Sequence, residues 1–398
     1  MAVPSHVAPQ APPREASAAL IARHRLADPV FVTRPTLPPL EQYHAHLETI
    51  WESRWLTNNG RLHQEFEARL RTYLGVEHIS VFCNGTIALM VALQALDIAD
   101  GEVITTPFTF PATSHVLFWN KVEPVFCDID PLTFNLDPAR IEALITPRTK
   151  AILPVHVFGY PCDTHAIQQI ADRHDLRVIY DAAHAFAVKD QSVPLAQAGD
   201  LSVLSFHATK LFSSIEGGAV VSRTAEQKQR VDFLKNFGFA DEETVIAPGI
   251  NGKMNEFQAA YGLLQLDTID ADIAHRKRIT NQYRRELDGV PGIQLPQDLP
   301  GVEHNYAYFA ILIDPAAYGL SRDALYTELK HFNVFTRKYF YPLCSEIPCY
   351  KGLSSSDPAN LPVAHKVAAN VLCLPIYGTL EETTVHAIAT ILRELGRH

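Results

Sequence analysis

The sequence predicts an α/β protein with a mostly parallel sheet covered by helices, followed by a smaller C-terminal α+β domain. Between about residues 79 and 222, short apolar runs alternate with helical stretches, the pattern of a parallel sheet. The chain has 398 residues, which is too long for one small core. Gly289, Pro291 and Gly292 then interrupt the chain before the pattern changes.

Each element follows from the spacing of apolar residues. Residues 1–35 are rich in Ala, Pro and Arg without a clear period, so we expect a partly disordered N-terminal arm. The large domain is expected over 36–270. Its predicted helices are 41–55, 64–74, 87–96 and 163–174, and its predicted strands are 79–83, 103–105, 122–126, 150–156, 176–180, 201–205 and 219–222.

The small C-terminal domain is expected over 271–398. A long helix over 255–287 leads into it. Beyond the break, the predicted elements are a strand at 307–313, a helix at 322–331, a strand at 334–336 and a helix at 381–395.

Composition excludes several classes of function. The net charge is −10 and no dense Lys/Arg cluster offsets it, so nucleic acid and anionic membranes are poor partners. No apolar run is long enough to span a membrane, the N-terminus lacks a signal-peptide pattern, and the six cysteines form no C-x-x-C, so we expect a cytoplasmic protein with reduced thiols. There is no Walker A, H-E-x-x-H or G-x-S-x-G motif, and no metal site is expected.

Three predicted strand ends carry polar residues, and ligands of open α/β sheets bind at such ends. The first is Asn84-Gly85-Thr86, between a strand and a helix. Gly85 allows a ligand to approach the backbone, and the free amides at the helix start suit a phosphate. The segment is equally typical of a simple helix cap.

The second strand end carries Asp181, directly after an apolar strand. A carboxylate there could hold the proton of a pyridinium nitrogen, although capping of the next turn is an equal alternative. His184 lies three residues further on and could contact the same ring, while a single histidine is more often a structural donor.

The third strand end is Ser205-Phe206-His207-Ala208-Thr209-Lys210. Ser205 could bind a phosphate, and Lys210 could form a Schiff base with an aldehyde cofactor once burial lowers its pKa. A single lysine is usually a solvated surface residue, but this one lies between two predicted strands of the sheet.

Taken together, these segments resemble the DegT/DnrJ/StrS sugar aminotransferases, which have the fold-type I pyridoxal-phosphate (PLP) architecture. The resemblance extends over about residues 30–398. Its further markers are Thr109-Phe110-x-Ala112-Thr113, Val155-His156-x-Phe158-Gly159, Asp181-Ala182-Ala183-His184-Ala185, Glu216-Gly217-Gly218, Asn251-Gly252-Lys253-Met254-Asn255, Gln258-Ala259-Ala260 and Tyr341-Pro342-Leu343.

The resemblance implies a role for each matching residue. Lys210 would be the Schiff-base lysine and proton shuttle, and Asp181 would pair with the pyridine nitrogen. The residues implied in the remaining cofactor contacts are Gly85, Thr86 and Ser205 at the phosphate, Phe110 on the ring face, His184 beside the ring, and Asn251 at the phosphate of the neighbouring subunit. A homodimer with shared active sites is therefore expected.

On the substrate side, the resemblance implies transfer of an amine from glutamate to a nucleotide-linked keto sugar. Cys344 stands where relatives often have His, which leaves the sugar contacts open; candidates for substrate binding are Lys253, Arg337, Tyr339 and Tyr341. Met254 and Gly262 are typical of enzymes that aminate C4, and the stretch 337–343 resembles enzymes that form dTDP-4-amino-4,6-dideoxyglucose. The expected substrate is thus dTDP-4-keto-6-deoxyglucose.

Four alternatives remain. Amination could occur at C3, or the sugar could be linked to GDP or UDP. A dehydratase of the same family would be expected to carry His in place of Lys210, and a binding protein on the same fold would be expected to have lost its cofactor residues.

Overall fold

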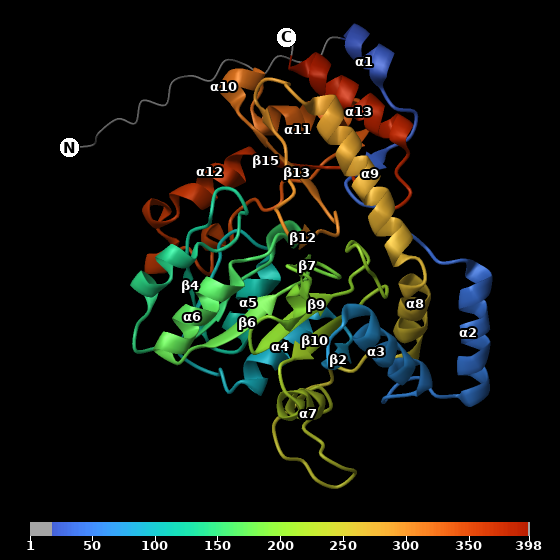
Figure 1. Ribbon diagram of the computed structural model, residues 1–398, viewed down its shortest axis with the longest axis vertical. Helices are drawn as coiled ribbons and strands as arrows, with labels where there is room; N and C mark the ends of the chain where they lie inside the picture. Colours follow the sequence, from blue (N-terminus) through green and yellow to red (C-terminus); the bar gives the residue numbers. More distant parts are fainter. Residues whose placement is uncertain (1–17, 397–398) are drawn as a thin grey trace.

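A seven-stranded sheet forms the centre of the protein in the computed structural model, which describes residues 18–396 (Figure 1). The strand order is β2-β10-β9-β6-β5-β3-β4. The strands are β2 (His78–Phe82), β3 (Glu102–Thr105), β4 (Glu123–Phe126), β5 (Thr149–Leu153), β6 (Arg177–Asp181), β9 (Leu201–Ser205) and β10 (Gly218–Ser222). All are parallel except β10, which runs antiparallel to both β2 and β9.

Helices cover both faces of this sheet. Alternate residues of each strand point to opposite faces, so each strand packs against helices on both sides. Val81 and Ala219 pack with α3 and α8, whereas Phe82 and Val220 pack with α4. The helices of the large domain are α2 (Leu40–Ser53), α3 (Arg61–Leu74), α4 (Gly85–Ala95), α5 (Pro111–Trp119), α6 (Thr164–His174), α7 (Ala225–Leu234) and α8 (Glu256–Leu266). The sheet is buried on both faces, which explains the apolar runs in its strands.

A second core lies toward the C-terminus, around the antiparallel sheet β11-β13-β15. Its strands are β11 (Ile293–Gln294), β13 (Phe309–Ile313) and β15 (Val371–Leu374), and its helices are α9 (Ile269–Leu287), α10 (Pro315–Tyr318), α11 (Arg322–His331), α12 (Pro362–Asn370) and α13 (Glu382–Leu395). In Figure 1, α9 leads from the large domain into this part of the molecule. The division of the chain near residue 270 stays a prediction.

Small pairings connect segments distant in sequence. A three-stranded sheet has the order β12-β7-β8, with β7 (Lys189–Asp190), β8 (Val193–Pro194) and β12 (Val302–Glu303). Part of the predicted arm is ordered: α1 (Ala18–His24) precedes β1 (Val30–Phe31), which pairs in parallel with β14 (Val334–Phe335). Residues 1–17 lie outside the described residues.

The predicted helix over 255–287 is wrong in one respect, because it is two helices. The helix α8 ends at Leu266 and α9 begins at Ile269. Neither Gly nor Pro marks this break, so apolar spacing alone could not locate it. The helices α5, α7 and α12 were not predicted. Across residues 18–396, none of the helices has the length and apolar character that crossing a membrane requires.

Candidate active site

Three segments meet at one edge of the central sheet. The parallel strands β2, β6 and β9 end at this edge, and the antiparallel strand β10 begins there. Their ends carry Asn84, Asp181, Ser205 and Gly218. The topology therefore brings together the three polar strand ends that the sequence indicated.

The place where α4, β9 and β10 approach one another closely, which we call the cradle, is the candidate phosphate site. A Cβ added at Gly85 would lie 3.0 Å from the Cβ of Ser205, and one added at Gly218 would lie 2.7 Å from the backbone nitrogen of Gly85. Asn84 caps α4, and its side chain accepts a hydrogen bond from the amide of Ile87 (2.8 Å). The first amides of α4, including that of Thr86, are left for a ligand by the geometry of a helix start.

Asp181 is a buried carboxylate with fixed partners; only 5% of it is exposed. Thr113 Oγ1 donates to Asp181 Oδ2 (2.8 Å), and the amide of Ala183 donates to Oδ1 (3.1 Å). Burial raises the pKa of Asp181, while these bonds and the Lys210 ammonium oppose the rise. Since Thr113 in turn contacts Thr109 (2.9 Å), the predicted Thr109–Thr113 segment holds the carboxylate in place.

Lys210 lies in the loop that joins β9 to β10. The amide of Lys210 donates to the carbonyl of His207 (2.8 Å), and the amide of Ser214 donates to that of Phe206 (2.9 Å), so the loop is folded back on itself. Burial lowers the pKa of Lys210 from 10.5 to about 8, and the Asp181 carboxylate opposes this change. An amine with this pKa is a competent nucleophile and proton carrier near neutral pH.

His184 lies in a wall of aromatic rings beside Asp181. Its Nδ1 accepts the amide hydrogen of Phe158 (3.2 Å), so the ring proton is on Nε2. Burial lowers the pKa of His184 well below its usual range, which keeps the imidazole neutral. Phe340 is parallel to it at a centroid distance of 5.7 Å, and Tyr308 lies 4.7 Å away.

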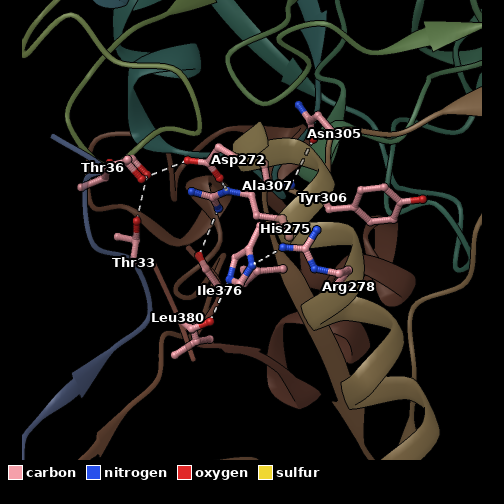
Figure 2. Close-up of polar contacts among 12 residues, drawn as sticks. Thr33, Thr36, Asp272, His275, Arg278, Asn305, Tyr306, Ala307, Ile376 and Leu380 are labelled. Carbon is pink, nitrogen blue, oxygen red and sulfur yellow. Dashed lines mark hydrogen bonds and ion pairs between the residues drawn. The ribbon is translucent and has the colours of Figure 1, made fainter. Parts of the chain in front are cut away.

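Tyr308 was not identified from the sequence. It precedes β13, inside an apolar run that reads as core. Asn305 fixes this segment, because its Nδ2 donates to the carbonyls of His184 and Phe186 (2.9 Å each). Its Oδ1 accepts from the amide of Ala307 (3.1 Å), as Figure 2 shows. Asn305 is visible in the sequence as a polar residue just before an apolar strand, but its contacts and those of Tyr308 are seen only in the folded chain.

Phe110 stands at the N-terminus of α5 with 57% of its surface exposed. A planar ligand would cover this ring face. Asn251 is also exposed, on a segment that bridges to Asn236. Neighbouring Lys253 donates to Asn236 Oδ1 (2.6 Å) and lies 4.9 Å from the ring centroid of Phe237. Neither Asn251 nor Lys253 is among the residues that Asp181 and Lys210 contact within the chain.

The substrate candidates in the stretch 337–341 have different surroundings. Tyr339 packs at right angles to Tyr308 with a centroid distance of 6.0 Å. The charge of the exposed Arg337 lowers the pKa of Tyr339, against a larger increase caused by burial. Tyr341 instead faces α11, where the Arg322 guanidinium lies 5.0 Å from its ring. Tyr339 is therefore on the His184 side and Tyr341 is not.

Met254 and Gly262, the two residues typical of enzymes that aminate C4, both lie in tightly packed places. Gly262 packs against the ring of Phe66, since an added Cβ would lie 2.5 Å from it, and Met254 is fully buried against Gly217. Cys344 is also buried, and its thiol donates to the carbonyl of Thr109 (3.3 Å). Among residues 18–396, no group of three or more His, Cys, Asp or Glu side chains is arranged to hold a metal ion.

The donor set fits PLP. A cradle closed to side chains suits the phosphate, Phe110 suits the ring face, Asp181 suits the ring nitrogen, and Lys210 suits the aldehyde. The fold and site together define a fold-type I PLP-dependent aminotransferase.

Comparison with known proteins identifies the family. Residues 40–393 match the DegT/DnrJ/EryC1/StrS aminotransferase family, and the chain belongs to it. The chain is 52% identical to the dTDP-4-amino-4,6-dideoxy-D-glucose transaminase of Escherichia coli, covering 91% of this chain and 97% of that protein, and 48% identical to that of Shigella dysenteriae, covering 92% and 99%. The structure of DesI with its TDP-sugar product is similar, with a TM-score of 0.90 at 37% identity, covering 95% of this chain and 96% of that one.

Proposed function

We propose that the enzyme transfers an amine from glutamate to C4 of dTDP-4-keto-6-deoxyglucose, forming dTDP-4-amino-4,6-dideoxyglucose. The observation that carries this proposal is the 52% identity with a transaminase named for that product. The match covers 97% of that transaminase. The likeness to DesI, described with a TDP-sugar product, supports the same class of nucleotide.

The cofactor would supply an aldehyde, whose carbon carries the amino group between the two substrates. It would also supply an electron-withdrawing ring. In our proposal, Gly85, Thr86 and Ser205 bind its phosphate, Phe110 covers one ring face, and Asp181 holds the proton on the ring nitrogen. This last role needs the ionised carboxylate, and the hydrogen bonds from Thr113 and Ala183 favour that form. Neutral His184 would face the bound ring with its Nε2–H.

Lys210 performs the covalent and proton-transfer steps. Because its pKa is about 8, about a tenth of the amine is neutral at pH 7 and about half at pH 8, and this neutral form can attack a carbonyl carbon. Once displaced by a substrate amine, the same Nζ is free to move a proton between the reacting carbons. Reduction with borohydride followed by peptide mapping tests this role, and a label on another lysine would refute it.

The substrate residues are proposed in two groups. Arg337 and Tyr339 lie on the His184 side of the small domain, where a cation and an aromatic ring can bind the diphosphate and base. Lys253 is close to Asn251, and we propose that both serve the active site of the partner subunit in a cytoplasmic homodimer. Tyr341 contributes through its contact with α11 rather than directly.

The deciding experiment supplies glutamate with dTDP-, GDP- and UDP-linked 3-keto and 4-keto sugars and identifies the product by NMR. We expect turnover with dTDP-4-keto-6-deoxyglucose and a new amine at C4. An amine at C3, or turnover with GDP- or UDP-sugars only, would refute the substrate assignment and leave the aminotransferase class intact.

A further inference from the structure

The segment 30–36, which we call the strap, crosses from the small domain to the large one. On the small-domain side, β1 pairs with β14, and Phe31 stacks on Phe335 at a centroid distance of 5.1 Å. The carbonyl of Val32 accepts the amide hydrogen of Ile376 (3.1 Å). The first half of the strap is therefore built into the small-domain core.

The second half contacts the large domain beside the proposed catalytic lysine. Thr33 Oγ1 donates to the carbonyl of Thr209 (3.4 Å), the residue directly before Lys210. The carbonyl of Thr36 accepts a hydrogen bond from Gln265 Nε2 in α8 (2.8 Å). The strap thus ties the Lys210 loop to both domains.

A buried ion pair anchors the end of the strap. Thr36 Oγ1 donates to Asp272 Oδ2 (3.0 Å), and Asp272 pairs with Arg276 one turn along α9. Arg276 Nη1 also donates to the carbonyl of Ile376 (3.1 Å), on the segment that binds Val32 (Figure 2). Both charged groups are buried, and a buried pair holds its neighbours firmly because neither charge can be left without its partner.

The strap has little room to move against the site. Together with Thr209, Tyr308 and Tyr339, the strap residues Val32 and Thr33 line an enclosed cavity of about 10 Å³, space for about one water molecule. Tyr308 is the residue that packs on His184. The strap, the Lys210 loop and the His184 wall therefore form one continuous packed unit.

We propose that Thr33 is a positioning residue for Lys210. By fixing the carbonyl of Thr209, the strap sets where the lysine amine stands relative to the cofactor ring, and Thr36 with Asp272 holds the strap in that place. This inference rests on the proposed role of Lys210. Small displacements of a reacting group cost up to about 100-fold in rate, so one hydrogen bond here can affect turnover.

The test compares Thr33→Val, which keeps the shape and removes the hydroxyl, with Thr33→Ser, which keeps the hydroxyl. Thr49→Val is the matched control, because Thr49 Oγ1 only bonds the carbonyl of Ala45 on the exposed face of α2. For each PLP-loaded enzyme we measure three quantities: the melting temperature, the pH midpoint of the cofactor absorbance without substrate, and kcat with KM for the nucleotide sugar. The absorbance midpoint reports on the Lys210–cofactor linkage without turnover.

For Thr33→Val we expect the midpoint to move by at least about 0.3 pH units and kcat to fall about 5-fold, with KM within about twofold and the melting temperature equal to that of Thr49→Val. Thr33→Ser should restore both values. Thr36→Val, which frees the other end of the strap, should change them in the same direction.

The proposal is overturned if Thr33→Val matches Thr49→Val in midpoint and kcat. It is also overturned if kcat falls only in step with the folded fraction and Thr33→Ser does not restore it. If the wild-type enzyme carries no cofactor on Lys210, the proposed role of that lysine fails instead, and peptide mapping separates the two cases.

Discussion

At the scale of single residues, Lys210 and Asp181 form a pair, and burial shifts the pKa of each toward its neutral form. Burial makes the lysine easier to deprotonate and would make the aspartate harder to ionise, while the attraction between their charges opposes both changes. A bound pyridinium would take over the role of counter-ion for Asp181. The pair is thus arranged for the loaded enzyme, and its cost to stability appears when the cofactor is removed.

The first prediction concerns the apo-protein. The pKa of Lys210 is about 8 in the folded protein, below its ordinary 10.5, so between these values the unfolded chain binds more protons and stability rises with pH. At pH 7 the buried ammonium destabilises the fold. The free energy of unfolding of Lys210→Met should therefore exceed that of wild type by on the order of 1–2 kcal/mol at pH 7. This difference should shrink toward pH 10.5. Urea denaturation across this pH range measures it.

Lys351→Met is the control, because Lys351 is exposed and its removal should leave the pH dependence unchanged. A gap between Lys210→Met and wild type that stays constant from pH 7 to pH 10.5 would contradict the assignment of the shifted pKa to Lys210.

The second prediction concerns Asp181→Asn. The amide keeps the shape and can still accept from Thr113, so the fold should be retained. It cannot hold the pyridinium proton by charge, so kcat should fall by about 10²–10⁴-fold, measured by steady-state kinetics alongside circular dichroism. Asp175→Asn serves as a control, since Asp175 is exposed in a left-handed conformation (φ 50°) that Asn tolerates. Near-wild-type turnover of Asp181→Asn would show that the carboxylate does not bind the ring nitrogen.

At the scale of elements, the phosphate cradle depends on the close approach of α4, β9 and β10. Gly85 is in the first turn of a helix, where Ala would be favoured by about 1 kcal/mol if space allowed. An added methyl, however, would press on Ser205 at 3.0 Å and would move one side of the cradle.

We therefore predict that Gly85→Ala folds normally but binds PLP about 10-fold more weakly, because a displaced phosphate loses charge-assisted hydrogen bonds. Titration of apo-protein with PLP, followed by absorbance, gives the affinity. Gly352→Ala is the matched control, because its added Cβ meets no atom within 4 Å. Equal PLP affinity of the two variants would place the phosphate elsewhere.

The elements that could be predicted are those whose burial alone determines their pattern of apolar residues. Strands buried between two helical layers read as short apolar runs, so β6 and β9 were located within a residue or two. The helix α7 was missed because only Val231 and Leu234 are buried along its largely polar sequence. Its capping box, from Thr224 to Gln227, was the available signal.

The site residues also divide into those that could be predicted from the sequence and those that could not. Lys210, Asp181, Ser205 and Gly85 could be found because each follows a recognisable strand, and the topology brings strand ends to one edge. Tyr308 and the strap reach the site from other elements through contacts between residues more than 100 positions apart, such as Tyr308 with His184 and Thr33 with Thr209. Local sequence carries no record of such contacts, so only the folded chain reveals them.

At the scale of the whole molecule, exposed apolar side chains form surfaces of the kind that subunit interfaces use. Trp51 at the end of α2 and Trp55 and Leu56 just after it are exposed. Phe237 and Ile246 are exposed in the segment that precedes Asn251. Large exposed aromatic and aliphatic groups of this kind mark interaction surfaces. A second copy of the chain is the partner that would also give Asn251 a function, because two-fold dimers are the commonest oligomers.

The last prediction tests whether the active site is shared between subunits. Lys210→Ala removes the proposed nucleophile, and Asn251→Asp places a negative charge where the partner's phosphate would lie, so each variant alone should be inactive. When the two are co-produced, a hybrid dimer contains one site with both substitutions and one site with neither. Random pairing makes about half of the dimers hybrids, so about a quarter of the sites, and of the wild-type activity, should return. Co-producing Lys210→Ala with a chain that carries both substitutions is the control and should restore nothing. If each site instead drew both residues from one chain, every hybrid would contain two damaged sites, and the absence of recovered activity would exclude sharing.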